Sequence, residues 1–121
     1  MKGGMERHIY TLVRRTDWAA AEKAGAYTGS EDDRRDGFLH FSTAGQLRAT
    51  AAKHRAGEAD LVIVEADAAA LGSALRFEPP ASGRPGLFPH LYGSLPLAAV
   101  SRVMPLPLGA DGVHCFPQGF A

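Results

Sequence analysis

The sequence lacks the features of a disulfide-stabilised, metal-binding or membrane-spanning protein. Its 121 residues include one cysteine, Cys115, so no disulfide can form within the chain. The five histidines are spread over positions 8, 40, 54, 90 and 114, without the close spacing of paired ligands, so we predict no metal site. No apolar run approaches the roughly 18 residues that a transmembrane helix needs. No secretory signal is evident, so we expect a cytoplasmic protein.

The sequence also has no excess of positive or negative charge. Thirteen basic residues balance thirteen acidic ones, whereas nucleic-acid-binding domains usually carry clustered positive charge. We therefore predict neither a nucleic-acid partner nor a membrane partner. The chain also has no phosphate-binding loop, no dinucleotide fingerprint and no Gly-x-Ser-x-Gly nucleophile elbow. The commonest sequence signals for nucleotide hydrolysis and for Ser-His-Asp hydrolysis are thus missing.

The apolar pattern that is present predicts a single α+β domain over residues 7–108. Helices are expected at residues 17–24 and 44–56, with a short helical turn at 68–71. Strands are expected at residues 7–13, 38–41, 60–66, 75–78 and 97–106. Helices and strands intermingle early and strands dominate later, which favours a mixed or largely antiparallel split sheet with two main helices. Residues 1–6 are expected to be a flexible leader, and residues 109–121 an irregular tail.

Local signals set the expected helix boundaries. Thr16 is expected to cap the first helix and Gly25 to end it. Residues 43–46, Thr-Ala-Gly-Gln, fit a capping box at the start of the second helix. Residues 26–35 between the helices are polar and include a run of charges, so we predict a solvated loop. We expect Trp18, the single tryptophan, to be a core anchor.

Residues 36–43, Asp-Gly-Phe-Leu-His-Phe-Ser-Thr, form the segment around which we expect a site. Asp-Gly is typical of a turn, and the strand that follows places His40 and Ser42 on one face. Thr43 then begins a helix, whose N-terminus attracts anions. A second segment carries His90 and Tyr92 at the same spacing of two. If the two segments meet, these side chains make one polar cluster.

Glu78 is the candidate carboxylate for this cluster. It ends the strand predicted at residues 75–78. Alternation places Arg76 and Glu78 on the same face, so a simple surface salt bridge is the alternative.

The residues that make up these segments resemble the bacterial family called domain of unknown function 952. The motifs that carry the resemblance are Ile9-Tyr10, Trp18, Asp36-Gly37-Phe38-Leu39-His40 with Ser42-Thr43, Asp60-Leu61-Val62, Phe77-Glu78 and Phe88-Pro89-His90-Leu91-Tyr92-Gly93. One departure is Thr11, where members of the family often have His or Lys.

The resemblance implies a fold like that of the ADP-ribosyltransferases, in which NAD binds in a cleft of a split α+β structure. It implies catalytic roles for His40 and Glu78, with the glutamate stabilising an oxocarbenium-like centre as nicotinamide leaves. The ligand-binding residues would be Ser42, Thr43, His90 and Tyr92. A second departure is that Glu78 precedes the His90 motif and no Glu follows it.

Three functional hypotheses follow from these residues. The first is an enzyme, or a degenerate relative of one, that binds NAD or a small phosphate-containing ligand resembling ADP-ribose. The second is a non-catalytic module that binds a small ligand or a protein. In the third, the histidines and Tyr92 only brace the fold through buried hydrogen bonds.

Overall fold

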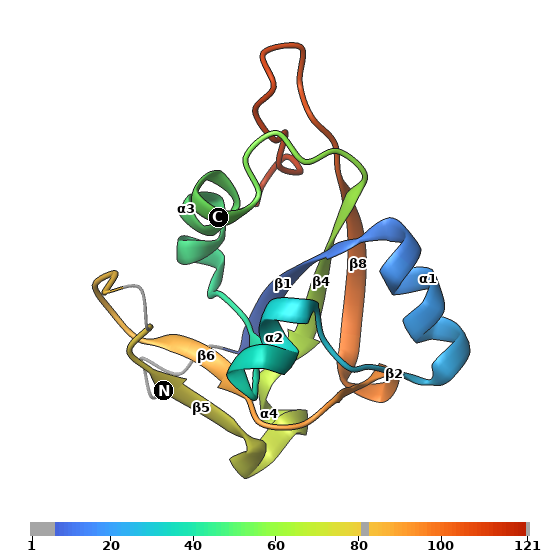
Figure 1. Ribbon diagram of the computed structural model, residues 1–121, viewed down its shortest axis with the longest axis vertical. Coiled ribbons are helices and arrows are strands. Elements are labelled where there is room, and N and C mark those ends of the chain that lie inside the picture. Colours follow the sequence, from blue (N-terminus) through green and yellow to red (C-terminus); the bar gives the residue numbers. More distant parts are fainter. Residues whose placement is uncertain (1–6, 81–82, 121) are drawn as a thin grey trace.

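The computed structural model, which describes residues 7–80 and 83–120, is a single α+β domain with antiparallel sheets and, within those ranges, four helices (Figure 1). The helices are α1 (Arg15–Ala24), α2 (Glu31–Asp36), α3 (Ala44–His54) and α4 (Ala68–Leu71), with 3₁₀ turns η1 (Gly72–Ala74) and η2 (Leu97–Ala99). The strands are β1 (His8–Arg14), β2 (Ala26–Tyr27), β3 (Leu39–His40), β4 (Leu61–Asp67), β5 (Leu75–Glu78), β6 (Phe88–Leu91), β7 (Leu95–Pro96) and β8 (Val100–Leu106). The leader expected at residues 1–6 lies outside the described residues.

The strands form three small sheets in which every pairing is antiparallel. The central sheet has the order β1-β4-β8, a second has the order β3-β6-β5, and β2 pairs with β7. Strand β4 lies at the centre because its residues 61–66 are buried on both faces, as their continuous apolar sequence favours. The expectation of a largely antiparallel α+β domain is therefore confirmed.

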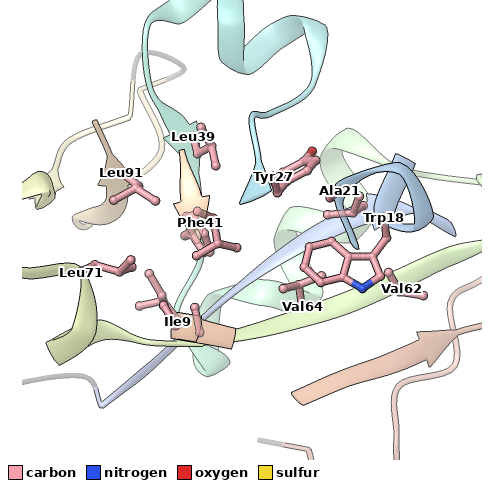
Figure 2. Close-up of a cluster of buried hydrophobic side chains, with 14 residues drawn as sticks. Ile9, Trp18, Ala21, Tyr27, Leu39, Phe41, Val62, Val64, Leu71 and Leu91 are labelled. Carbon is pink, nitrogen blue, oxygen red and sulfur yellow. The ribbon is translucent and has the colours of Figure 1, made fainter. Parts of the chain in front are cut away.

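Alternation along β1 and β4 divides the core between the two faces of the central sheet. Figure 2 shows the first cluster, in which Ile9 and Val64 pack with Trp18 and Ala21 of α1 and with Leu39 and Leu91 of the second sheet. The other face packs against α3 and against the C-terminal segment through Tyr10, Leu12, Leu47, Ala51, Leu61, Ile63 and Leu106. Trp18 is thus a core residue.

One bridge joins the central sheet to the second sheet. The N–H of Tyr10 donates to the carbonyl of Ser42 at 2.8 Å, and the N–H of Ser42 donates to the carbonyl of Tyr10 at 2.7 Å. The Thr11 hydroxyl adds a bond to the His40 carbonyl at 3.0 Å. The segment after β3 therefore runs beside the edge of β1, and this contact fixes where His40 lies.

Several local predictions about the helices are wrong. Arg14, not Thr16, is the N-cap of α1, because the helix follows β1 without a loop. Residues 26–35 are not a solvated loop, since they contain β2 and most of α2. Helix α3 ends at His54, which is exposed, and not at residue 56.

Strand boundaries also differ from the prediction. β3 comprises only Leu39 and His40 instead of residues 38–41. The turn expected at Asp36-Gly37 is the C-terminal end of α2, where Gly37 has a positive φ of 90°. The last strand begins at Val100 after a 3₁₀ turn. The tail contains no helix or strand within its described residues 109–120, yet Phe120 packs edge-on against Tyr10 with ring centroids 5.1 Å apart.

Candidate functional site

A groove of about 980 Å³ lies beside β1, and Tyr10, Thr11, Leu12 and Arg14 of that strand line it. Residues of α1, β2, α2 and α3 also line it. His40, Ser42 and His90 lie in the lining, together with Arg84 from the loop before β6. This volume is at the upper end of the range for small-molecule and cofactor sites.

His40 lies between two carboxylates at one end of this groove. Its Nδ1 is 2.5 Å from Oδ1 of Asp33, and its Nε2 is 3.0 Å from Oδ2 of Asp36. The backbone N–H of His40 also donates to Asp33 Oδ1 at 3.1 Å. The pKa of His40 is raised, first because of the bond to Asp33, although partial burial acts in the opposite direction. A protonated imidazole donates to both carboxylates.

The capping box at the start of α2 holds Asp33 in position. The N–H of Asp33 donates to Ser30 Oγ at 3.2 Å, and the N–H of Ser30 donates to Asp33 Oδ2 at 2.9 Å. Burial of Asp33 raises its pKa, but the hydrogen bonds from His40 and Ser30 outweigh burial, and the pKa is lowered overall. Asp33 is therefore a buried carboxylate with one oxygen fixed by the helix cap and the other by His40.

A second imidazole–carboxylate pair lies beside the first. His90 is only 4% exposed, and its Nδ1 lies 2.8 Å from Oε1 of Glu78. The Tyr92 hydroxyl donates to the same Glu78 oxygen at 2.7 Å. The bond from Tyr92, followed by that from His90, lowers the pKa of Glu78, and the same contact raises the pKa of Tyr92.

The Phe38 ring connects the two pairs. It stacks on His90 with centroids 4.1 Å apart, and it lies 4.7 Å from the His40 ring and 5.3 Å from the Tyr92 ring. His40 and His90 are themselves paired residues of β3 and β6, with ring centroids 5.8 Å apart. The two histidine-bearing segments thus meet as neighbours.

The other predicted site residues are distributed around this cluster. Ser42 is buried and its hydroxyl bonds to Thr50 Oγ1 at 2.8 Å, on the α3 side of the groove. Thr43 is the N-cap of α3, and its N–H donates to Gln46 Oε1 at 2.9 Å. Thr43, Glu78 and Tyr92 are not part of the groove lining. Glu78 therefore reaches the groove only through His90.

The surface ion pair considered for Glu78 is not formed. Among the described residues, Arg76 makes no ion pair with Glu78, and its guanidinium lies 5.0 Å from the centre of the Tyr92 ring. Although Arg76 and Glu78 occupy alternate positions of β5, the Glu78 carboxylate is already bonded to two groups of the neighbouring chain segment.

Sequence reasoning missed Asp33, Asp36 and Phe38 as parts of the site. Asp33 and Asp36 belong to the segment interpreted as a loop and turn. One signal was present, because Ser30 followed three residues later by an acidic residue is the pattern of a helix start. The role of Phe38 had no local signal, since its contacts depend on β3 pairing with β6.

The described residues contain no cluster of three His, Cys, Asp or Glu side chains that could hold a metal ion. None of the helices in the described ranges is long and apolar enough to cross a bilayer.

A protein-family model matches the part of the chain that contains this site. The family model described as "Protein of unknown function (DUF952)" matches residues 12–103, which include α1 to α4 and the two paired histidines. The chain belongs to this family. The resemblance seen in the two His-containing motifs is thereby confirmed. A search of curated proteins gave no match.

Solved structures of another protein share the fold. The crystal structure of protein CC0527 from Caulobacter crescentus has 41% identity and a TM-score of 0.82, and the match covers 89% of this chain and 93% of that one. The solution NMR structure of CC0527 has 41% identity and a TM-score of 0.78, with 92% and 91% covered. A double mutant of CC0527 gives 40% identity and a TM-score of 0.82, with 89% and 93% covered. At this identity and coverage, the chain shares the fold of CC0527.

Proposed function

We propose that the groove of this DUF952 protein binds NAD or a related ADP-ribose-like ligand, with His40 as the group that acts on it. The observation that carries the proposal is the imidazole of His40, which lines the groove and is held by the buried carboxylate of Asp33. An ADP-ribosyltransferase-like reaction is the form of activity that fits this arrangement.

The charges at this end of the groove suit the nicotinamide ribose. Asp36 lies beside His40 Nε2 and its side chain is 34% exposed, so it can meet a ligand entering the groove. A carboxylate accepts hydrogen bonds from ribose hydroxyls and attracts the positive charge of an oxidised nicotinamide ring. The groove is also large enough for an elongated ligand of dinucleotide size.

The two histidines have different roles in this proposal. Asp33 fixes the orientation of His40 by its bond to Nδ1, so Nε2, which lies beside Asp36, is the nitrogen that a ligand meets. His90 binds the ligand from the opposite strand. Glu78 and Tyr92 act through His90 as positioning residues, since neither lines the groove.

The reaction that fits is cleavage of the bond between the ribose and nicotinamide. The electron pair of that bond leaves with nicotinamide, and the positive charge that develops on the ribosyl carbon faces Asp36. A water or another nucleophile then forms the new bond to this carbon, and its proton is released to solvent water.

A non-catalytic binding module is the second candidate. It is favoured by one observation, that both ring nitrogens of His40 are already bonded to carboxylates. In that case a ligand occupies the groove without turnover.

Calorimetry with NAD, ADP-ribose and nicotinamide tests the binding. We expect His40→Ala to weaken the binding of NAD at least tenfold, because a groove-lining hydrogen-bond donor is lost. His8→Ala is the matched control, since His8 is not part of the groove lining, whereas His54 is. No heat from any of the three ligands at millimolar concentration, with folded protein, would contradict the proposal. Mass spectrometry of released nicotinamide then separates an enzyme from a binding module.

A further inference from the structure

The groove has a second polar region on its α3 side, around Arg84. The Arg84 Nη1 donates to Thr50 Oγ1 at 3.2 Å, and its guanidinium lies 4.4 Å from the centre of the Phe88 ring. Thr50 in turn bonds to Ser42 at 2.8 Å. Arg84, Thr50, Ser42 and Phe88 all line the groove. The Arg84 guanidinium is thus held at the groove wall by the Thr50 hydroxyl and the face of the Phe88 ring.

Four other arginines line the groove, and three of them pair with carboxylates. Arg14 and Arg55 pair with Glu58, Arg35 pairs with Asp32 and Asp36, and Arg34 donates to the Gly29 carbonyl at 2.7 Å. No carboxylate of the described residues lies within 4.0 Å of the Arg84 guanidinium. Its positive charge is therefore available to an anion that enters the groove.

The loop that carries Arg84 is fastened to α3. Gln46 Nε2 donates to the Leu87 carbonyl at 2.7 Å, and the same side chain accepts from the N–H of Thr43. His54 lies one turn after Thr50 on α3 and also lines the groove. Burial, followed by the nearby charge of Arg84, lowers the pKa of His54. His54 and Arg84 thus both line the groove next to Thr50, His54 one helical turn further along α3 and Arg84 through its hydrogen bond.

We propose that Arg84, Thr50 and His54 form the phosphate subsite of the groove and take a diphosphate or phosphate monoester. The inference rests on the proposed function, in which the His40 end receives the nicotinamide ribose. A guanidinium presents several N–H donors in a fixed plane and matches phosphate oxygens in pairs. Stacking on Phe88 orients that plane, and Thr50 supplies a hydroxyl beside it.

The charges around His40 and around Arg84 explain how one ligand is oriented. Carboxylates lie beside both ring nitrogens of His40, whereas Arg84, whose partner Thr50 bonds to Ser42, has no carboxylate partner among the described residues. A phosphate at the His40 end would face Asp33 and Asp36 and be repelled. The diphosphate of a bound dinucleotide is thereby directed toward Arg84.

Binding of pyrophosphate, measured by calorimetry, tests the subsite without the rest of the ligand. We expect Arg84→Ala to weaken pyrophosphate binding at least tenfold and Arg84→Lys to retain part of it, since a lysine keeps the charge but not the paired donors. Arg76→Ala is the control, because Arg76 is an exposed arginine that stacks on Tyr92 outside the groove. The histidine NMR signals give a second readout, in which pyrophosphate raises the pKa of His54.

The outcomes separate this inference from the proposed function. Pyrophosphate binding that is equal in Arg84→Ala and the wild type overturns the subsite, as does the absence of any pyrophosphate binding by folded wild-type protein. If NAD binding depends on His40 but not on Arg84, the subsite is wrong and the proposed function stands. If pyrophosphate binding depends on Arg84 but NAD and ADP-ribose do not bind, the subsite stands and the proposed function fails.

Discussion

His40 and His90 face each other as paired residues of β3 and β6, and each has a carboxylate on its Nδ1. Asp33 comes from a short helix that precedes β3, whereas Glu78 comes from the strand on the far side of β6. The two pairs therefore depend on different parts of the fold, although Phe38 contacts both imidazoles. This separation allows each pair to be tested by its own substitution.

The first prediction concerns the proton affinity of His40. Replacing Asp33 with Asn removes the negative charge and the strongest cause of the raised pKa. We therefore expect the pKa of His40 in Asp33→Asn to fall toward 6.5, its ordinary value. Asp36→Asn should produce a smaller fall, because the Asp36 contact contributes less. A histidine NMR titration measures both values.

Asp32→Asn serves as the control for that titration. Asp32 is an exposed residue of the same helix, and it pairs with Arg35 rather than with His40. An unchanged pKa of His40 in Asp33→Asn would show that the imidazole does not make the bond described here.

The second prediction concerns stability against pH. The pKa of His40 is higher in the folded protein than its ordinary 6.5, so its bonds stabilise the fold fully below about pH 6.5. This contribution is lost as the pH rises through the folded pKa. The pKa of Asp33 is lowered below 3.8, so its contribution is present above that pH and is lost as the pH falls through the folded value.

Urea denaturation of the wild type and His40→Gln checks this dependence. We expect the free energy of unfolding to differ most below about pH 6.5 and the difference to shrink as the pH rises through the raised pKa of His40, where the imidazole of the wild type loses its charge. If the difference in free energy of unfolding between the two proteins grew with pH, an imidazolium held by Asp33 and Asp36 would be ruled out.

The central strands were predictable from sequence because their signal is local. The apolar run at residues 61–66 identified β4, and the Thr-Ala-Gly-Gln pattern placed the start of α3 correctly at Ala44. The short helical turn predicted at residues 68–71 is α4, whose N-cap Asp67 accepts from the N–H of Ala69 at 3.0 Å.

The missed elements depend on contacts between distant residues. Helix α2 has the sequence Glu-Asp-Asp-Arg-Arg-Asp and presents no apolar stripe, so periodicity does not identify it. What stabilises it is its capping box and the burial of Asp33 against His40, which requires β3 to be in place. Likewise, the pairing of His40 with His90 joins segments 50 residues apart, and only the complete sheet determines its register.

The third prediction concerns the bond between Tyr92 and Glu78. The hydrogen bond that the Tyr92 hydroxyl donates to Glu78 raises the pKa of Tyr92, because the bond needs the protonated phenol, and the negative charge of the carboxylate acts in the same direction. We expect Glu78→Gln to lower this pKa toward 10.0, which is its ordinary value. Ultraviolet titration of the tyrosines measures the change. Comparison with the double variant Glu78→Gln/Tyr92→Phe, which lacks the Tyr92 hydroxyl, identifies the signal of Tyr92. If the alkaline titration of Glu78→Gln matches that of the wild type, Tyr92 does not donate to Glu78.

The fourth prediction compares two glycines at the ends of α2. Both have positive φ, 102° at Gly29 and 90° at Gly37, so an alanine is strained at either position. At Gly37 an added Cβ meets nothing within 4 Å, and we expect a cost of about 1–2 kcal/mol from the backbone alone. At Gly29 the Cβ would lie 2.7 Å from Asp33 Cβ, so the start of the helix must shift.

Gly29→Ala should therefore destabilise the protein more than Gly37→Ala does, and it alone should disturb the site. Moving Asp33 weakens its bond to His40, which is the main cause of the raised pKa of His40. We expect that pKa to fall in Gly29→Ala and to stay unchanged in Gly37→Ala, because an alanine at Gly37 contacts no neighbouring side chain. Urea denaturation and a histidine NMR titration of the two variants measure both effects. Equal losses of stability with an unchanged pKa of His40 in both would show that α2 does not position the site through Asp33.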